Sequence, residues 1–192
     1  GNFKVILTPF KCFNFGVGTE PDDDQLCTDS RDQILNSKLL QDAEKIYLHE
    51  DFNGEWINDL LTFLQSLRSA TKAPIYLLGP RLTFKKSVFQ IADEHGSLQG
   101  LSEYALTQSF LPERVTLNLK LQGAIEKSNL PASNIHYIDM LTTQCGESFN
   151  WCDIVSPKTG EFLYFDNSHF TTLGAREFGA ILKARHPDLF RF

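Results

Sequence analysis

Three short apolar runs, separated by helical patterns, dominate the distribution of hydrophobic and polar positions along the chain. The runs are IYLH at residues 46–49, IYLL at 75–78 and IHYI at 135–138, and their aromatic and β-branched content is typical of buried strands. Between them, apolar positions recur at helical spacing over residues 56–69 and 112–126. Strands that alternate with helices indicate a parallel sheet, so we expect an α/β fold whose sheet contains all three runs.

Three further helices are predicted. We predict helices over residues 88–94 and 173–184. Another is predicted over residues 29–42, where Asp29 or Ser30 is placed to cap the first turn, because a short side-chain oxygen can accept a hydrogen bond from a free amide. We therefore interpret Asp29 and Ser30 as a helix start.

The composition is that of one ordinary globular domain. The chain has 192 residues, of which 42% are hydrophobic and 22% charged. No run approaches the roughly 18 consecutive apolar residues that a membrane span needs. The formal net charge of −6 and the scattered basic residues argue against nucleic acid as a partner, because binding a phosphate backbone depends on clustered Lys and Arg.

The four cysteines form two pairs that are close in sequence, Cys12 with Cys27 and Cys145 with Cys152. Local disulfides are the simplest of the three possible connectivities, and they favour an oxidising compartment. A zinc site and four buried free thiols are the alternatives. Neither spacing is Cys-x-x-Cys, and no histidine stands at ligand distance in the sequence, so we expect no bound metal.

Asp166 and His169 are the residues best suited to chemistry. Nucleophilic acyl transfer needs a base that takes the proton of a hydroxyl, and a carboxylate that fixes the tautomer of the base. A carboxylate three residues before a histidine, in the turn that leads into the helix over residues 173–184, can reach one ring nitrogen while the other faces a cleft. The alternative is that Asp166 is a turn or cap residue beside a surface histidine.

Two other polar groups follow predicted strands, where ligands of open α/β sheets gather. Asn53 and Gly54 come after the run at 46–49, and Arg81 comes after the run at 75–78. Arg81 has the charge to contact an anionic sugar or acyl donor. We interpret it instead as a surface arginine after a turn, and leave it out of the candidate catalytic residues.

The run YFDNSHFTTLGA at residues 164–175 closely resembles the last block of SGNH (GDSL-like) hydrolases, in which an Asp-x-x-His precedes the C-terminal helix. It is most similar to the version fused to membrane acyltransferases of the acyltransferase-three family, which O-acetylate bacterial surface polysaccharides. Most of the chain takes part, because these segments follow in the family's order: IYLHEDF, IYLLGPRLTF, YIDMLTTQC, the loop from Cys145 to Cys152, and LYFDNSHFTTLGA. The resemblance implies one domain over residues 1–192 with the three-layer α/β/α, flavodoxin-like SGNH fold.

The resemblance also implies roles for individual residues. His169 would be the base of a serine triad and Asp166 the carboxylate that orients it. Asn53 stands where the family places an oxyanion-hole asparagine, although Asn-Gly is also a common tight turn. Because the resemblance places the domain outside the cytoplasm, it favours disulfides for both cysteine pairs.

The Gly-Asp-Ser block that supplies the family's nucleophile is not found in the chain. Asp29 and Ser30 follow an acidic loop instead of a strand, so they do not replace it. The run FKVILTPF at residues 3–10 aligns better with the family's second strand, which predicts that the first strand and its serine come from residues outside this chain. Without that strand, backbone groups in the middle of the sheet would be unpaired. The alternative is that residues 3–10 are the first strand and that TPF at residues 8–10 has replaced the nucleophile.

The function implied by the resemblance is O-acyl transfer, with acetyl as the expected group, to a hydroxyl of a cell-envelope polysaccharide such as lipopolysaccharide through a serine acyl-enzyme. No bound cofactor is implied, because a membrane acyltransferase domain on the N-terminal side, or acetyl-CoA upstream of it, would supply the acyl group. The domain would then be periplasmic or otherwise extracytoplasmic, and tethered to the inner membrane. A carbohydrate esterase with the same residues and a catalytically inert, glycan-binding pseudoenzyme are the alternatives.

Overall fold

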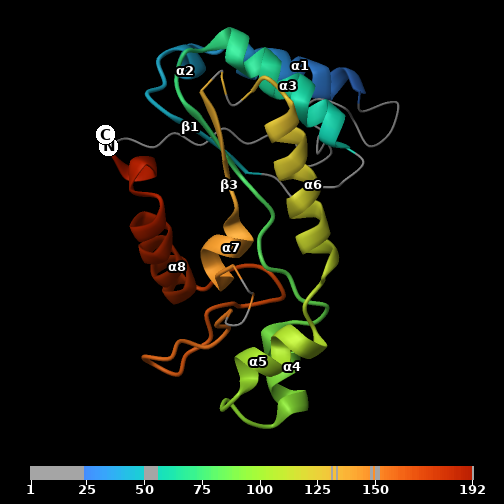
Figure 1. Cartoon of the computed structure of the whole chain (residues 1–192), viewed down its shortest axis with the longest axis vertical. Helices are drawn as coiled ribbons and strands as arrows, with labels where there is room; N and C mark the ends of the chain where they lie inside the picture. The colour runs from blue at the N-terminus through green and yellow to red at the C-terminus, as the bar shows by residue number, and fades with distance from the viewer. Residues whose placement is uncertain are drawn as a thin grey trace. The chain divides into compact units, whose positions relative to one another are not determined.

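A computed structural model of the chain (Figure 1) describes residues 24–49, 56–130, 132, 134–147, 149 and 152–191. The chain divides into two compact units. The first takes the chain as far as Gly79 and returns for Leu119–Ile138, and the second comprises Pro80–Asn118 and Asp139–Arg191. The three predicted strands belong to the first unit, and Asp166 and His169 belong to the second.

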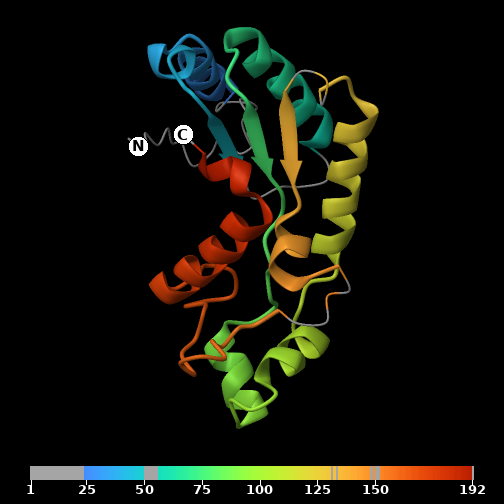
Figure 2. The same cartoon turned by 60° about the vertical axis from the view of Figure 1, so that its left-hand side comes forward.

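The three runs form a parallel sheet. Its strands are β1 (Ile46–His49), β2 (Ile75–Leu78) and β3 (Ile135–Ile138), hydrogen-bonded in the order β1-β2-β3. Figure 2 shows them side by side in that order. The predicted boundaries and the parallel pairing are confirmed.

The register of the sheet places similar side chains opposite one another on neighbouring strands. Ile75 lies opposite Ile135, and both side chains are buried. On the neighbouring position, Tyr47, Tyr76 and His136 lie opposite one another, and their rings stack with centroids 5.6 and 5.1 Å apart. Cross-strand aromatic pairs of this kind add to sheet stability and hold the register.

The helix predicted over residues 29–42 is two helices, and its predicted start is wrong. They are α1 (Asp24–Leu35) and α2 (Lys38–Gln41). Asp29 lies inside α1, where its carboxylate accepts a hydrogen bond from the Gln25 amide one turn earlier instead of capping the helix. The cap is provided by Ser37, whose hydroxyl accepts the Leu40 amide of α2.

The remaining helices of the first unit lie within one residue of their predicted bounds, although Leu119, an apolar residue of the second one, is 62% exposed. They are α3 (Ile57–Ala70) and the second half of α6 (Glu113–Lys127), whose first half belongs to the second unit. The buried side chains of α3 recur every three or four residues, as an amphipathic helix requires: Leu60, Phe63, Leu64 and Leu67. No helix among the described residues is long and apolar enough to cross a membrane.

The second unit contains short helices around a compact core. In chain order they are α4 (Val88–His95), α5 (Leu101–Gln108), α7 (Met140–Cys145), α8 (Thr172–Arg185) and the 3₁₀ helix η4 (Pro187–Phe190). The helices predicted over residues 88–94 and 173–184 are therefore confirmed to within one residue at each end. Ser87 and Gln90 start α4 with a reciprocal capping box.

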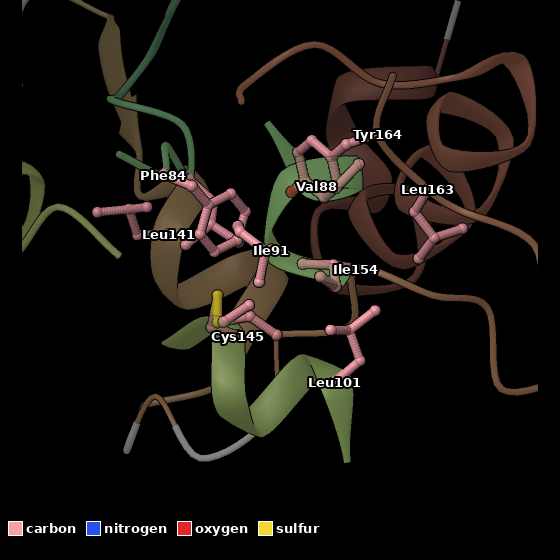
Figure 3. Close-up of a cluster of buried hydrophobic side chains, with 12 residues drawn as sticks. Phe84, Val88, Ile91, Leu101, Leu141, Cys145, Ile154, Leu163 and Tyr164 are labelled. Carbon is pink, nitrogen blue, oxygen red and sulfur yellow. A yellow bond between two sulfur atoms is a disulfide. The ribbon is translucent and has the colours of Figure 1, made fainter. Parts of the chain in front are cut away.

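A buried cluster of apolar side chains holds the second unit together (Figure 3). Phe84 packs edge-on against Tyr164, with ring centroids 5.8 Å apart.

The predicted disulfide between Cys145 and Cys152 is present and lies in this cluster. Cys27 is also disulfide-bonded. Its predicted partner, Cys12, lies outside the described residues, so that pairing stays a prediction.

Candidate active site

Asp166 and His169 stand in a tight turn between two extended segments. Tyr164 forms an antiparallel bridge with Phe170, and the Phe165 amide donates to the His169 carbonyl at 3.0 Å. The bridge brings the ends of the turn together. It therefore exposes Phe165 and His169 to solvent, whereas Ser168 between them is buried.

The Asp166 carboxylate fixes the shape of this turn. Its Oδ1 accepts the amides of Ser168 at 2.8 Å and of His169 at 2.7 Å. An aspartate that accepts amides two and three residues later closes a turn locally. Asp166 is thus a turn residue, as one interpretation of the sequence predicted. This role does not exclude a second one, because only one of its two carboxylate oxygens is used in the turn.

The other oxygen of that carboxylate meets the histidine ring. Asp166 Oδ2 lies 2.6 Å from His169 Nδ1, which confirms the contact predicted from the spacing. Partial burial acts to raise the pKa of the Asp166 carboxyl. Hydrogen bonds from the His169 amide, the Ser168 amide and the His169 ring outweigh that effect and lower the pKa from 3.8 to about 2. Asp166 is therefore ionised at neutral pH and can only accept, so Nδ1 donates.

The turn is fastened to the segment that leads into α4. The Phe84 amide donates to the Asn167 carbonyl at 2.9 Å, and the Asn167 side-chain amide donates back to the Phe84 carbonyl at 3.3 Å. The Val88 amide also reaches the Asp166 carbonyl at 3.3 Å. Because Phe84 and Val88 are fully buried, the turn rests on a rigid support.

The chain leaves the turn through a capped helix packed tightly on the strand-like segment before it. The Thr171 hydroxyl accepts the Gly174 amide and donates to the Phe162 carbonyl, so it caps α8 and holds the preceding segment. Gly174 lies so close to that segment that an added Cβ would come 1.9 Å from the Leu163 carbonyl oxygen. A glycine is therefore required there.

Arg81 contacts the nitrogen of His169 that faces away from Asp166. Its Nη2 lies 3.2 Å from His169 Nε2. The expectation that Nε2 faces an open cleft is wrong in this respect, as is the interpretation of Arg81 as a surface residue without a part in the site. The sequence signal was the place of Arg81 shortly after β2, but a separation of 88 positions in the chain hid its contact with His169.

Phe165 is a second neighbour that the sequence reasoning missed. Its ring stacks on the His169 ring, with centroids 5.6 Å apart and planes 20° apart. Both side chains remain accessible, since 55% of Phe165 and 51% of the His169 side chain are exposed. The histidine is thus held at both nitrogens and on one face, but it is not buried.

Two other predicted elements of the site cannot be placed. Asn53, the predicted oxyanion-hole residue, lies outside the described residues, and so does the run at residues 3–10. Ser30, the serine of the apparent Asp-Ser pair, is inside helix α1 and does not follow a strand. Among the described residues, no group of three or more His, Cys, Asp or Glu side chains could hold a metal ion.

Comparison with models of known protein families identifies the family of the chain. The model of the SGNH domain fused to AT3 domains matches residues 5–184. The chain belongs to this family. The resemblance of residues 164–175 to the last SGNH block is therefore confirmed at the level of the whole domain, and Asp166 and His169 stand in that block.

A solved structure agrees with the family match. The periplasmic domain of a lipopolysaccharide acetyltransferase from Salmonella ser. Paratyphi A is similar to the chain, with a TM-score of 0.60 and 16% sequence identity. The likeness covers 84% of this chain and 62% of that one, so the chain spans less than two thirds of its length. The likeness concerns the fold, and with the family match it confirms the predicted α/β/α class. No curated protein matches the chain.

Proposed function

We propose that this SGNH domain transfers an acyl group, expected to be acetyl, to a hydroxyl of a cell-envelope polysaccharide through a serine acyl-enzyme. The observation that carries the proposal is the pairing of Asp166 Oδ2 with His169 Nδ1 at 2.6 Å, on an exposed turn of a domain of this family. An ionised carboxylate behind an accessible imidazole is the arrangement that a general base requires.

His169 acts as base and then as acid in each half of the reaction. Its Nε2 takes the proton of the serine hydroxyl as the serine oxygen attacks the acyl carbonyl, and then gives that proton to the leaving group. In the second half, Nε2 takes the proton of a sugar hydroxyl, the sugar oxygen attacks the acyl-serine, and the proton returns to the serine. Asp166 stabilises the imidazolium in both halves without being protonated itself.

The remaining parts of the machinery rest on the family resemblance. The nucleophile would be the serine of a Gly-Asp-Ser block outside this chain, so that residues 1–192 form one SGNH domain without its first strand. Asn53 would help to stabilise the oxyanion. A membrane acyltransferase domain, of the kind to which the family is fused, would supply the acyl group, and the domain would work in the periplasm.

Hydrolysis by the same residues and glycan binding without catalysis are the competing functions. A histidine buried on both sides and far from Asn53 would favour the pseudoenzyme. Half of the His169 side chain is exposed, and Asn53 lies outside the described residues. Transfer and hydrolysis differ in what reaches the acyl-serine, a sugar hydroxyl or water.

Trapping of the acyl-enzyme tests the proposal. The full-length protein is incubated with 4-nitrophenyl acetate as acyl donor and examined by peptide mass spectrometry. Wild type should accumulate an acetylated serine, and His169→Ala should not. His136→Ala is the matched control, because His136 is also exposed and has an oxygen partner, Asn134 Oδ1, at 2.8 Å. Equal serine acetylation in wild type and folded His169→Ala would contradict the proposal.

A further inference from the structure

The side chain that covers His169 Nε2 is a pure hydrogen-bond donor. A guanidinium carries N–H groups and no acceptor, so at 3.2 Å from Arg81 Nη2 the His169 Nε2 must be the accepting, unprotonated nitrogen. This agrees with a proton on Nδ1, where Asp166 accepts. The contact therefore occupies the lone pair that a general base uses.

The position of Arg81 is fixed by its surroundings. Leu82 and Phe84, which follow it, are fully buried, and the Thr83 hydroxyl donates to the Arg81 carbonyl at 3.3 Å. Phe84 is in turn tied to Asn167 in the turn that carries His169. The two segments are thus joined by backbone hydrogen bonds, and the contact between their side chains follows from that junction.

Arg81 has no competing partner among the described residues. No carboxylate there forms an ion pair with it, and its only side-chain hydrogen bond is the one to His169. A guanidinium paired with a carboxylate would be held away from the ring. Because Arg81 is not so held, imidazole Nε2 is its preferred acceptor.

Water is the molecule that this contact would exclude. With 51% of the His169 side chain exposed, solvent reaches the ring, and Phe165 covers only one face. Once the serine oxygen is acylated it has no proton to donate, so Nε2 has no partner from the nucleophile. A water that donates to Nε2 at that stage can lose its proton to the ring and attack the acyl-serine, which releases the free acid and restores the serine.

We propose that Arg81 covers the lone pair of His169 Nε2 in the acyl-enzyme and thereby favours transfer to a glycan hydroxyl over hydrolysis. The inference rests on the proposed function and makes Arg81 a positioning residue that acts through His169. The serine hydroxyl in the first half, and a bound acceptor hydroxyl in the second, displace the guanidinium. Free water competes less well, because a hydrogen bond from a charged donor is stronger than one from a neutral donor.

The first test measures coverage of Nε2 without using activity. Diethyl pyrocarbonate attacks the unprotonated ring nitrogen of accessible histidines, and peptide mass spectrometry gives the rate at His169, with His136 as internal reference. Arg81→Met removes the donors and should raise the rate at His169 by about 10-fold or more. In Arg81→Lys, which keeps a charged donor, the rate at His169 should lie between those of wild type and Arg81→Met. Lys85→Met is the control, because Lys85 is an exposed cation whose side chain has no hydrogen bond or ion pair among the described residues.

The second test measures the fate of the acyl group in the full-length protein. With labelled acetyl donor and polysaccharide present, the ratio of free acetate to glycan ester should rise by about 10- to 100-fold in Arg81→Met, while Lys85→Met matches wild type. An unchanged rate of diethyl pyrocarbonate modification, or an unchanged ratio, would overturn the proposal. If modification rises but neither wild type nor variant transfers acetyl, the proposed function fails and coverage of Nε2 stands.

Discussion

The Asp166 carboxylate holds His169 at two points, accepting its backbone amide at Oδ1 and facing its ring nitrogen Nδ1 with Oδ2. One side chain therefore sets both the course of the turn and the orientation of the ring. This explains why a spacing of three residues is sufficient for the carboxylate to reach the ring. It also predicts that a substitution at Asp166 can reduce activity without disrupting the turn.

Asp166→Asn should abolish most activity while the turn survives. The amide oxygen can still accept the Ser168 and His169 amides, but a neutral side chain cannot stabilise an imidazolium and permits the wrong tautomer. We expect acyl transfer by the full-length protein to fall by about 10³- to 10⁴-fold, with unchanged circular dichroism. Activity within a few-fold of wild type would mean that Asp166 is only a turn residue.

The lowered pKa of Asp166 makes a pH prediction. A carboxyl whose pKa falls from 3.8 to about 2 on folding stabilises the folded state above its unfolded pKa, and that contribution is lost as the pH falls through about 2. Urea unfolding between pH 4 and pH 2 should therefore show a steeper loss of stability in wild type than in Asp166→Asn. Parallel stability curves for the two proteins would rule out the shift.

Two glycines of α8 should respond to alanine in opposite directions. At Gly174 a Cβ would meet the Leu163 carbonyl oxygen at 1.9 Å, so Gly174→Ala should lower the free energy of unfolding by about 1–3 kcal/mol. At Gly179 nothing lies within 4 Å, so Gly179→Ala should raise it by up to about 1 kcal/mol through helix propensity. Equal effects of the two substitutions would show that α8 does not pack on the segment before the turn as described.

The disulfide between Cys145 and Cys152 should contribute measurably to stability. Closing a loop of this length restricts the unfolded chain by about 2.5 kcal/mol on the chain-entropy model. Replacing both cysteines with alanine should cost at least that much in denaturant unfolding under non-reducing conditions, since both side chains are also buried. A double variant as stable as wild type would exclude a structural role for the bridge.

The parts of the structure that the sequence predicted well depend on near neighbours in the chain. Each strand is a short apolar run bounded by polar or turn residues, so its ends can be read from the sequence: Ile46–His49, Ile75–Leu78 and Ile135–Ile138. The contact between Asp166 and His169 joins residues that are only three positions apart. The start of the helix over residues 29–42 was mispredicted because α1 already begins at Asp24, which places Asp29 inside the helix, where its side chain accepts from Gln25.

The parts that the sequence could not predict depend on distant segments. Arg81 reaches His169 because buried residues join two segments that are far apart in the chain, and no local pattern encodes that junction. The need for a glycine at position 174 is of the same kind, since it arises from the approach of α8 to the Leu163 backbone. Helical spacing alone permits alanine there.

The most direct test of the proposed function is the acetyl content of the polysaccharide made by cells that carry the full-length protein or its His169→Ala variant, measured by NMR of the purified glycan. Because a base at the exposed turn contributes little to folding, the variant should be present at the wild-type level and lack its O-acetyl esters, while His136→Ala retains them. A glycan acetylated to the wild-type level in cells with folded His169→Ala protein would contradict the assignment of His169 as the catalytic base.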